Sequence, residues 1–185
     1  MQLQKKEHNC TYADYCTWDD GKRWELIEGV PYAMAPGPSQ VHQSISGDLF
    51  VQLHNFLKGK PCKLFSAPFD VRLNADTGDD TVVQPDILVV CDQSKLDGKS
   101  CIGAPDFIVE ITSPSSLRLD RLIKLLQYQR SGVREYWIVE PESKSVSVHL
   151  LENGKYTITA YGDDEIAPVH VLEGCTINLR EVFDI

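Results

Sequence analysis

Glu110 is the residue whose surroundings point most directly to chemistry. It lies inside residues 107–111, a segment that is otherwise apolar. Because strand side chains alternate between faces, Glu110 is expected to share a face with Ile108 and Thr112. An ionised carboxylate in such surroundings is costly unless a cation or several hydrogen-bond donors lie against it. A bound metal ion would meet that need.

A second acid, Asp86, opens another apolar segment directly after Pro85. Proline fixes the local backbone and favours an extended entry into a strand. If the two strands are neighbours, Asp86 and Glu110 converge near one edge of the sheet. Two carboxylates and a backbone carbonyl, such as that of Ile111, suit Mg²⁺ or Mn²⁺, which also accept phosphate oxygens. The spacing alone fits equally a turn aspartate and a glutamate paired with a basic side chain.

Asp120, Lys124 and Tyr128 recur every four residues in the segment that follows. On a helix they lie along one side, away from a stripe of apolar residues. The stripe consists of Leu119, Leu122, Ile123 and Leu126. A lysine on such a helix could bring its ammonium near a water or phosphate oxygen held by a metal. The same pattern also describes an ordinary solvated face with one ion pair four residues apart.

An ordered series of short motifs resembles the Uma2 family of the PD-(D/E)XK nuclease superfamily. The resemblance runs from about Trp24 to the C-terminus. The motifs are residues 25–29 (ELIEG), His42, Pro85-Asp86, residues 109–115 (VEITSPS), Asp120, Lys124, Tyr128, Gly132-Val133 and residues 135–137 (EYW). The ordered series is more specific than any of its parts.

The resemblance implies a magnesium-dependent phosphodiesterase core, in which Asp86 and Glu110 match the metal-binding acids. The superfamily normally places a lysine two residues after the glutamate, but here that position is Thr112. In the Uma2 family a lysine on the following helix takes this role, and Lys124 matches it. The expected activity is hydrolysis of DNA phosphodiester bonds by an endonuclease.

Glu28 and His42 match other family positions and could add a metal or substrate contact. A hydrogen-bonding role for His42 and a turn position for Glu28, beside Gly29, fit the sequence as well. Tyr136 and Trp137 lie in an apolar segment and are expected in the core rather than stacked on bases.

Periodicity predicts a hairpin, a helix, three strands, a second helix and a strand meander. The expected ranges are a short helix at 12–18, a hairpin of 24–28 and 30–34, a helix at 40–58, strands at 62–73, 82–91 and 105–112, a helix that starts near 113–116 and ends at 131–132, strands at 135–139, 146–151 and 156–160, and a terminal helix at 179–183. With the resemblance, this order predicts a restriction-endonuclease-like α/β fold. Its mixed central sheet would be flanked by helices, with an N-terminal hairpin and a C-terminal antiparallel meander.

The bulk composition is that of a globular protein. The 185 residues, of which 42% are hydrophobic and 24% charged, are expected to form one domain over 1–185, with 1–20 as an N-terminal extension or short helix. No apolar run is long enough for a signal peptide or a membrane span, so we expect a cytoplasmic protein. Its six scattered cysteines are accordingly expected to be reduced thiols.

Charge is distributed unevenly. The net charge of −9 argues against broad, non-specific binding to nucleic acid, but residues 117–134 carry +4 and could face phosphates. The expected partner is nucleic acid, taken as DNA. An alternative is a non-catalytic module that binds nucleic acid or a protein through Arg118, Arg121 and Lys124. A homodimer formed through the exposed edge of the meander is compatible with either function.

Overall fold

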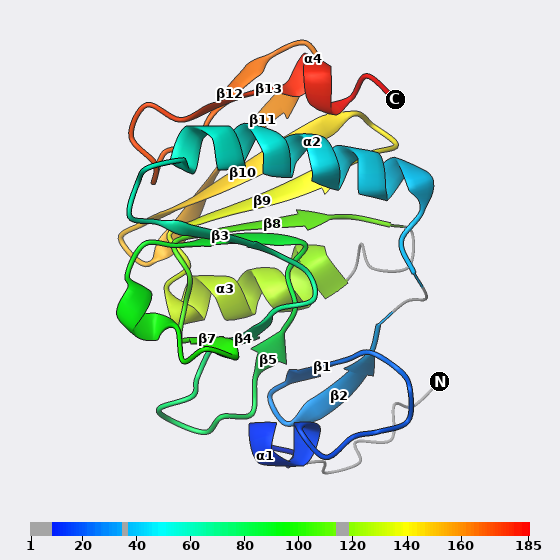
Figure 1. Cartoon of the computed structure of the whole chain (residues 1–185), viewed down its shortest axis with the longest axis vertical. Coiled ribbons are helices and arrows are strands. Elements are labelled where there is room, and N and C mark those ends of the chain that lie inside the picture. Colours follow the sequence, from blue (N-terminus) through cyan, green and yellow to red (C-terminus); the bar gives the residue numbers. More distant parts are fainter. Residues whose placement is uncertain (1–8, 35–36, 114–118) are drawn as a thin grey trace.

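The computed structural model describes residues 9–34, 37–113 and 119–185. In this part of the chain, a six-stranded central sheet has the order β11-β10-β9-β8-β6-β3 (Figure 1). Its strands are β3 (Lys63–Ser66), β6 (Ile87–Val90), β8 (Phe107–Ile111), β9 (Glu135–Glu140), β10 (Ser145–Glu152) and β11 (Lys155–Gly162). β8 and β9 run parallel, whereas the other neighbouring pairs are antiparallel. The sheet is therefore mixed, as predicted.

A second sheet of short strands, in the order β2-β1-β5-β4-β7, lies beside the central one. Its strands are β1 (Trp24–Ile27), β2 (Val30–Ala33), β4 (Asp70–Arg72), β5 (Val82–Val83) and β7 (Ser100–Ile102). The remaining elements are α1 (Tyr12–Tyr15), the 3₁₀ turn η1 (Gln93–Lys95), the pair β12 (Ile166–Pro168) and β13 (Thr176–Asn178), and α4 (Leu179–Val182). The N-terminal hairpin is thus present, and it is the outer part of this second sheet.

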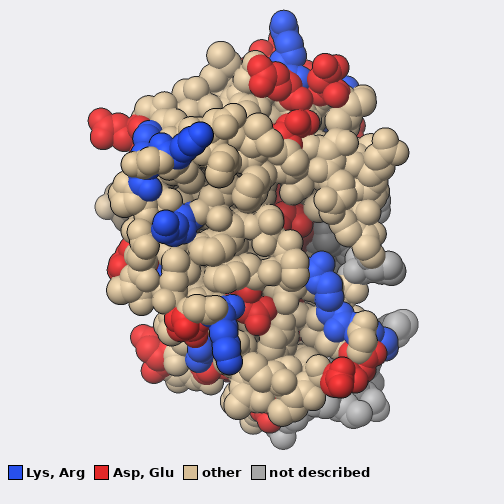
Figure 2. Space-filling model, in the orientation of Figure 1, with Lys and Arg blue, Asp and Glu red and all other residues tan. Residues whose placement is uncertain are grey.

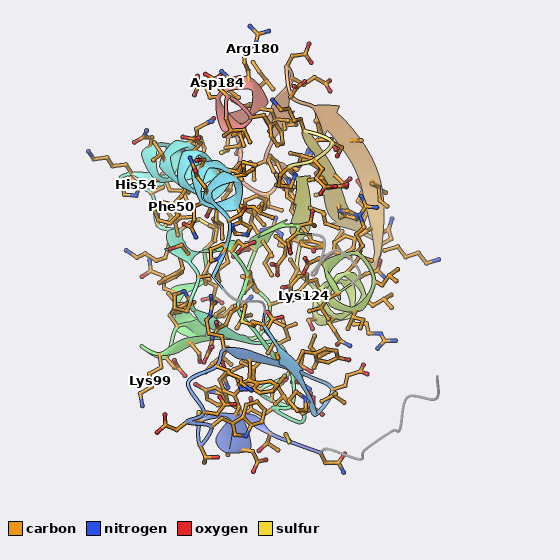
Figure 3. All side chains as sticks on the ribbon, turned by 90° about the vertical axis from the view of Figure 1, so that its right-hand side faces the viewer. Phe50, His54, Lys99, Lys124, Arg180 and Asp184 are labelled. Carbon is orange, nitrogen blue, oxygen red and sulfur yellow. A yellow bond between two sulfur atoms is a disulfide. The ribbon has the colours of Figure 1, made fainter. Side chains whose placement is uncertain are left out.

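Helices cover the two faces of the central sheet. α2 (Gln40–Leu57) begins after the capping residue Ser39 and buries a side chain once per turn against one face. The opposite face is covered by α3 (Leu125–Ser131), by the π-helical segment η2 (Leu119–Lys124) that precedes it, and by the second sheet. Figure 3 shows α2 and α3 on opposite sides of the central strands.

Strand alternation divides the core into two clusters. Phe107, Val109 and Ile111 pack on the α2 side, whereas Ile108 packs on the α3 side. Glu110 has the same parity as Ile108, so the two share a face, as the sequence predicted, and this face lies against α3. Tyr136 and Trp137 are fully buried, which confirms their expected place in the core.

Two predicted strands are each divided into a pair. The predicted strand 62–73 is interrupted at Ala67-Pro68, so β3 joins the central sheet and β4 joins the second one. The predicted strand 82–91 is likewise split into β5 and β6 at residues 84–86, where Pro85 lacks the amide hydrogen that a continuous ladder needs. Each proline thus lets the chain pass from one sheet to the other.

The expectation of six reduced cysteines is wrong for one pair. The antiparallel register of β3 and β6 matches Lys63 with Val90, so Cys62 and Cys91 come to lie opposite each other. They form a disulfide with 3.9 Å between their Cα atoms. The other cysteines are free thiols, as predicted.

Several local predictions are confirmed. Gly132, in the left-handed conformation, ends α3, and Asn153-Gly154 forms the turn between β10 and β11.

The predicted helix start at 113–116 lies largely outside the described residues. β11 is an edge strand of the central sheet and exposes Ile158, so the predicted self-association through the meander edge stays a prediction that light scattering can test. Among the described helices, none has the length and apolar character needed to cross a bilayer.

His149 on β10 should make stability depend on pH. Its ring is buried near Tyr136 and Tyr156, with ring centroids 5.6 and 5.8 Å away, and burial lowers its pKa below 6.5. As the pH falls through 6.5, the unfolded chain binds a proton that the native state does not, so the free energy of unfolding falls. In urea unfolding, wild type should lose about 1 kcal/mol more than His149→Phe between pH 7 and 5.5. Equal losses in both proteins would contradict this.

Candidate active site

A cleft of about 1140 Å³ opens at the end of the central sheet where β8 terminates. Its walls include the first turn of α2, the start of η2 and part of the second sheet. In Figure 1 these elements meet at the right-hand end of the sheet, and Figure 2 shows acidic side chains inside a hollow on that side. The predicted site residues other than Glu28 and Tyr128 line this cleft.

Asp86 and Glu110 meet in this cleft because their strands are neighbours. β6 and β8 pair antiparallel with Ile87 opposite Val109, which brings Asp86 beside the end of β8. Oδ2 of Asp86 accepts a hydrogen bond of 2.8 Å from the amide of Ile111. The prediction that the two acids converge at one end of adjacent strands is therefore confirmed.

Glu110 is held by two donors from the helix that covers its face. Its Oε1 accepts hydrogen bonds from Lys124 Nζ at 2.9 Å and from the Tyr128 hydroxyl at 2.7 Å. Burial raises the pKa of Glu110 well above 4.5; the Lys124 ammonium opposes this rise, and nearby Asp120 and Asp86 add to it. Glu110 thus needs a cation beside it to stay ionised at neutral pH.

The Lys124 ammonium lies at the centre of a buried group of acids. Only 3% of the residue is exposed, and its Nζ lies 2.8 Å from Glu25 Oε1, 2.9 Å from Glu110 Oε1 and 3.6 Å from Asp120 Oδ1. Burial alone would lower the pKa of Lys124, but these carboxylates raise it well above 10.5. Lys124 is therefore a fixed cation at neutral pH. Figure 3 places it between α3 and the central strands.

The polar side of η2 and α3 faces inward, so its interpretation as a solvated face is wrong. Asp120, Lys124 and Tyr128 are buried, whereas Leu122 is 56% and Leu126 47% exposed. The reversal has a physical cause. Inside the protein the polar groups bind one another and Glu110, so burying them leaves no isolated charge.

Tyr128 should contribute more to stability than a tyrosine that donates to a neutral acceptor. Tyr128→Phe removes the donor to Glu110, and hydrogen bonds to charged groups are worth about 1.5–3 kcal/mol. Tyr156→Phe is the matched control, because the Tyr156 hydroxyl donates to the neutral carbonyl of Val133 at 2.9 Å. Its expected cost in urea unfolding is about 1 kcal/mol. Equal costs would show that Glu110 carries no charge in the folded protein.

His42 lies in the site, and Glu28 does not. His42, in the first turn of α2, places Nε2 3.2 Å from Asp86 Oδ2, while its buried Nδ1 has no hydrogen-bond partner among the described residues. Burial alone would lower the pKa of His42, but the hydrogen bond and charge of Asp86 raise it above 6.5. Glu28 lies at the exposed tip of the first hairpin and pairs with Arg130 at 3.0 Å. Its alternative interpretation as a turn residue is the correct one.

Glu25 is the site residue that the sequence analysis missed. It is only 2% exposed, contacts the Lys124 ammonium, and accepts a hydrogen bond of 2.9 Å from the amide of Gln84. The signal that could have identified it is the one that identified Glu110. Both are acids within otherwise apolar strands, and Glu25 lies between Trp24 and Leu26.

In the described part of the chain, the basic side chains of the predicted helix face either pair with acids at the surface or are buried. Arg121 pairs with Glu140, Arg134 pairs with Asp106 at 3.1 Å, and Lys124 is buried. Arg118 lies outside the described residues. Among the described residues, the lysine and arginine side chains that line the cleft besides Lys124 are Arg23 and Lys144.

Comparisons with known proteins agree with this architecture. A model of the Uma2 family, described as "Putative restriction endonuclease", matches residues 11–180. The "Uncharacterized protein slr1290" of Synechocystis sp. is 28% identical over 152 residues, which cover 80% of this chain and 78% of that protein. A crystal structure of a "putative nuclease belonging to DUF820" from Anabaena variabilis superposes with a TM-score of 0.75 and 19% identity, covering 94% of this chain and 97% of the other.

The structural match shows that the fold is the restriction-endonuclease-like α/β fold, as predicted. The family match extends over nearly the whole chain, and its range includes Asp86, Glu110 and Lys124. The chain belongs to the Uma2 family of nuclease-like proteins.

Proposed function

We propose that this chain is a magnesium-dependent endonuclease, a hydrolase that cleaves DNA phosphodiester bonds. One observation carries the proposal: two carboxylates, Asp86 and Glu110, meet at the ends of adjacent strands in a large cleft, with the Lys124 ammonium against one of them. This is a combination that phosphoryl chemistry needs, because both the metal and the cation can offset charge on the phosphate.

The donor set fits a hydrated divalent ion. The hydrogen bonds to these two acids use Oδ2 of Asp86 and Oε1 of Glu110. No donor among the described residues contacts Oδ1 of Asp86 or Oε2 of Glu110, so these oxygens are open to a metal ion. In that part of the chain, no group of three or more His, Cys, Asp or Glu side chains is placed to hold a metal ion. Mg²⁺ needs no such group, since it usually keeps several waters and binds through one or two carboxylates. The carbonyl of Ile111 as a further ligand stays a prediction.

The residues of the site have separate tasks in this proposal. A bound Mg²⁺ would supply the Lewis acidity that makes a phosphate more open to attack by water. The Ile111 amide and His42 fix the orientation of Asp86. Lys124 stays protonated because of the surrounding acids, so it stabilises negative charge on the phosphate and does not accept a proton from water.

Arg23 and Lys144 are the proposed phosphate contacts of the cleft. A protein that neutralises phosphates releases counterions, so its log affinity for duplex DNA falls as log salt rises. Each lost phosphate contact makes this negative slope shallower by about 0.9. Arg23→Gln and Lys144→Gln should each weaken binding and make the slope shallower by about this amount, measured by fluorescence anisotropy with a labelled duplex. Arg130→Gln is the control, because Arg130 pairs with Glu28 outside the cleft lining. An unchanged slope in the two cleft variants would contradict the proposal that Arg23 and Lys144 contact phosphates.

The activity itself is tested on supercoiled plasmid and on structured RNA, with Mg²⁺ or Mn²⁺. Wild type should nick the plasmid, and Asp86→Asn and Glu110→Gln should not. Equal cleavage by all three proteins would identify a contaminating nuclease and remove the support for the proposal. Preferential cleavage of RNA would correct the substrate class.

The alternative of a non-catalytic module that binds through Arg118, Arg121 and Lys124 stays a prediction. Its best support is the acidic net charge and the absence of a lysine two residues after Glu110, whereas the burial of Lys124 counts against it. If it held, binding would survive chelation of metal and the loss of Glu110.

A further inference from the structure

Glu25 joins the second sheet to the candidate active site. It lies on β1, whereas Lys124 lies on η2 and Glu110 on β8. Oε1 of Glu25 accepts from Lys124 Nζ at 2.8 Å and from the Gln84 amide at 2.9 Å. The backbone amide therefore fixes the carboxylate that contacts the ammonium.

Stability alone gives no reason for this arrangement. Taking charges out of water costs several kcal/mol for each ion, and apolar residues of similar volume often replace buried ion pairs without loss of stability. Here an ammonium and three carboxylates, from Glu25, Glu110 and Asp120, are gathered at one edge of the cleft. A functional task for Glu25 explains what packing does not.

The Lys124 ammonium and a divalent ion would compete for Glu110. Lys124 donates to Oε1 of the same carboxylate that the proposed function assigns to the metal. Two cations near one carboxylate repel each other, and the repulsion is strong where burial keeps water out. The ammonium therefore needs another negative group close by if Glu110 is to serve the metal as well.

We propose that Glu25 is a positioning residue that retains the Lys124 ammonium beside the cleft while Glu110 binds the metal ion. The inference rests on the proposed function, which it deepens. Glu25 is closer to Nζ than Asp120 is, at 2.8 against 3.6 Å, and it is fixed by a backbone donor. Without Glu25, the Lys124 ammonium would pair mainly with Glu110.

The test is the affinity of the protein for Mn²⁺ without DNA, measured by electron paramagnetic resonance. Glu25→Gln should weaken Mn²⁺ binding about tenfold, or about 1.4 kcal/mol, because the ammonium is then left on Glu110. In the Lys124→Met background the same substitution should weaken it by less than about threefold, since only a nearby charge is lost. Glu28→Gln is the matched control from the same hairpin, because Glu28 is exposed and lies outside the cleft lining. It should leave Mn²⁺ affinity unchanged.

A second variant separates position from charge without altering Lys124. Glu25→Asp keeps the negative charge but shortens the side chain, so the carboxylate no longer reaches the ammonium at 2.8 Å. It should weaken Mn²⁺ binding at least about threefold if position matters. In plasmid cleavage, Glu25→Gln should lower kcat and leave KM for DNA unchanged, because its buried carboxylate makes no surface for DNA.

The outcomes separate this inference from the proposed function. Equal effects of Glu25→Gln with and without Lys124, or wild-type affinity in Glu25→Asp, would overturn the positioning role while the nuclease proposal stands. Failure of wild type to bind Mn²⁺ would overturn the proposed function, and the inference with it.

Discussion

Glu110→Gln is expected to lower the rate of DNA cleavage by about a thousandfold or more at saturating Mg²⁺. The substitution keeps the size of the side chain and an oxygen that can accept from Lys124 and Tyr128, but it removes the negative charge that a metal ligand needs. Charge stabilisation by a metal is worth several kcal/mol, and about 4 kcal/mol corresponds to a thousandfold in rate. Single-turnover cleavage of a labelled duplex measures the effect without contributions from product release.

A control separates loss of chemistry from loss of folding. Glu142→Gln also removes an acid from the cleft lining. In the described part of the chain, however, Glu142 makes no hydrogen bond or ion pair with Asp86 or Lys124. It should cleave within about threefold of wild type, since removal of a charge on the cleft wall chiefly changes association. If Glu110→Gln retained wild-type cleavage at every Mg²⁺ concentration, Glu110 would not be a metal ligand.

Lys124→Met is expected to lower the free energy of unfolding by about 3–5 kcal/mol at pH 7, the cost of breaking a buried ion pair from one side. The substitution leaves Glu25, Glu110 and Asp120 without their shared cation, and all three are buried. Urea unfolding measures the loss. Lys99→Met is the control, because Lys99 is exposed and surface substitutions usually change stability by less than about 0.5 kcal/mol.

The loss should depend on pH in a defined direction. Burial already raises the pKa of Glu110, and removal of the ammonium raises it further. A carboxyl whose folded pKa is raised binds a proton more tightly in the native state, so the variant should recover stability as the pH falls from 7 towards 5. If Lys124→Met were as stable as wild type at pH 7, the acids around Nζ would not be ionised together.

The sequence was sufficient for the parts of the site that lie within one element. Glu110 in an apolar strand and Asp86 after Pro85 each carry their signal in a few neighbouring residues, and the structure places both in the cleft. The long helix α2 was equally predictable, because its apolar residues recur at helical spacing from Ile45 to Leu57. The Asn153-Gly154 turn follows from the backbone conformation that this pair favours.

The parts that were missed depend on partners distant in sequence. β4 and β5 have only three and two residues, too few to show a period, and β5 pairs with β1 through Leu26 and Val82. The role of Glu25 could not be assigned for the same reason, since Lys124 lies on a separate element. Its place in an apolar strand marks Glu25 as unusual, but not which cation it contacts.

The inward polar face of η2 and α3 opposes the usual rule for amphipathic helices. The rule places apolar residues inside because isolated charges are costly there, and Leu122 and Leu126 fit it by sequence. It fails where the charges neutralise one another, which requires Glu110 and Glu25 to arrive from two different sheets. Such compensation is visible only in three dimensions.

A crystal structure of the wild-type protein soaked in Mn²⁺ would show whether Asp86 and Glu110 share one metal ion. We expect one strong anomalous peak in the cleft, in contact with a carboxylate oxygen of Asp86 and one of Glu110, with the Lys124 ammonium still bound to Glu25. A peak that touches neither acid, or a cleft without a peak at a concentration that supports cleavage, would contradict the proposed metal site.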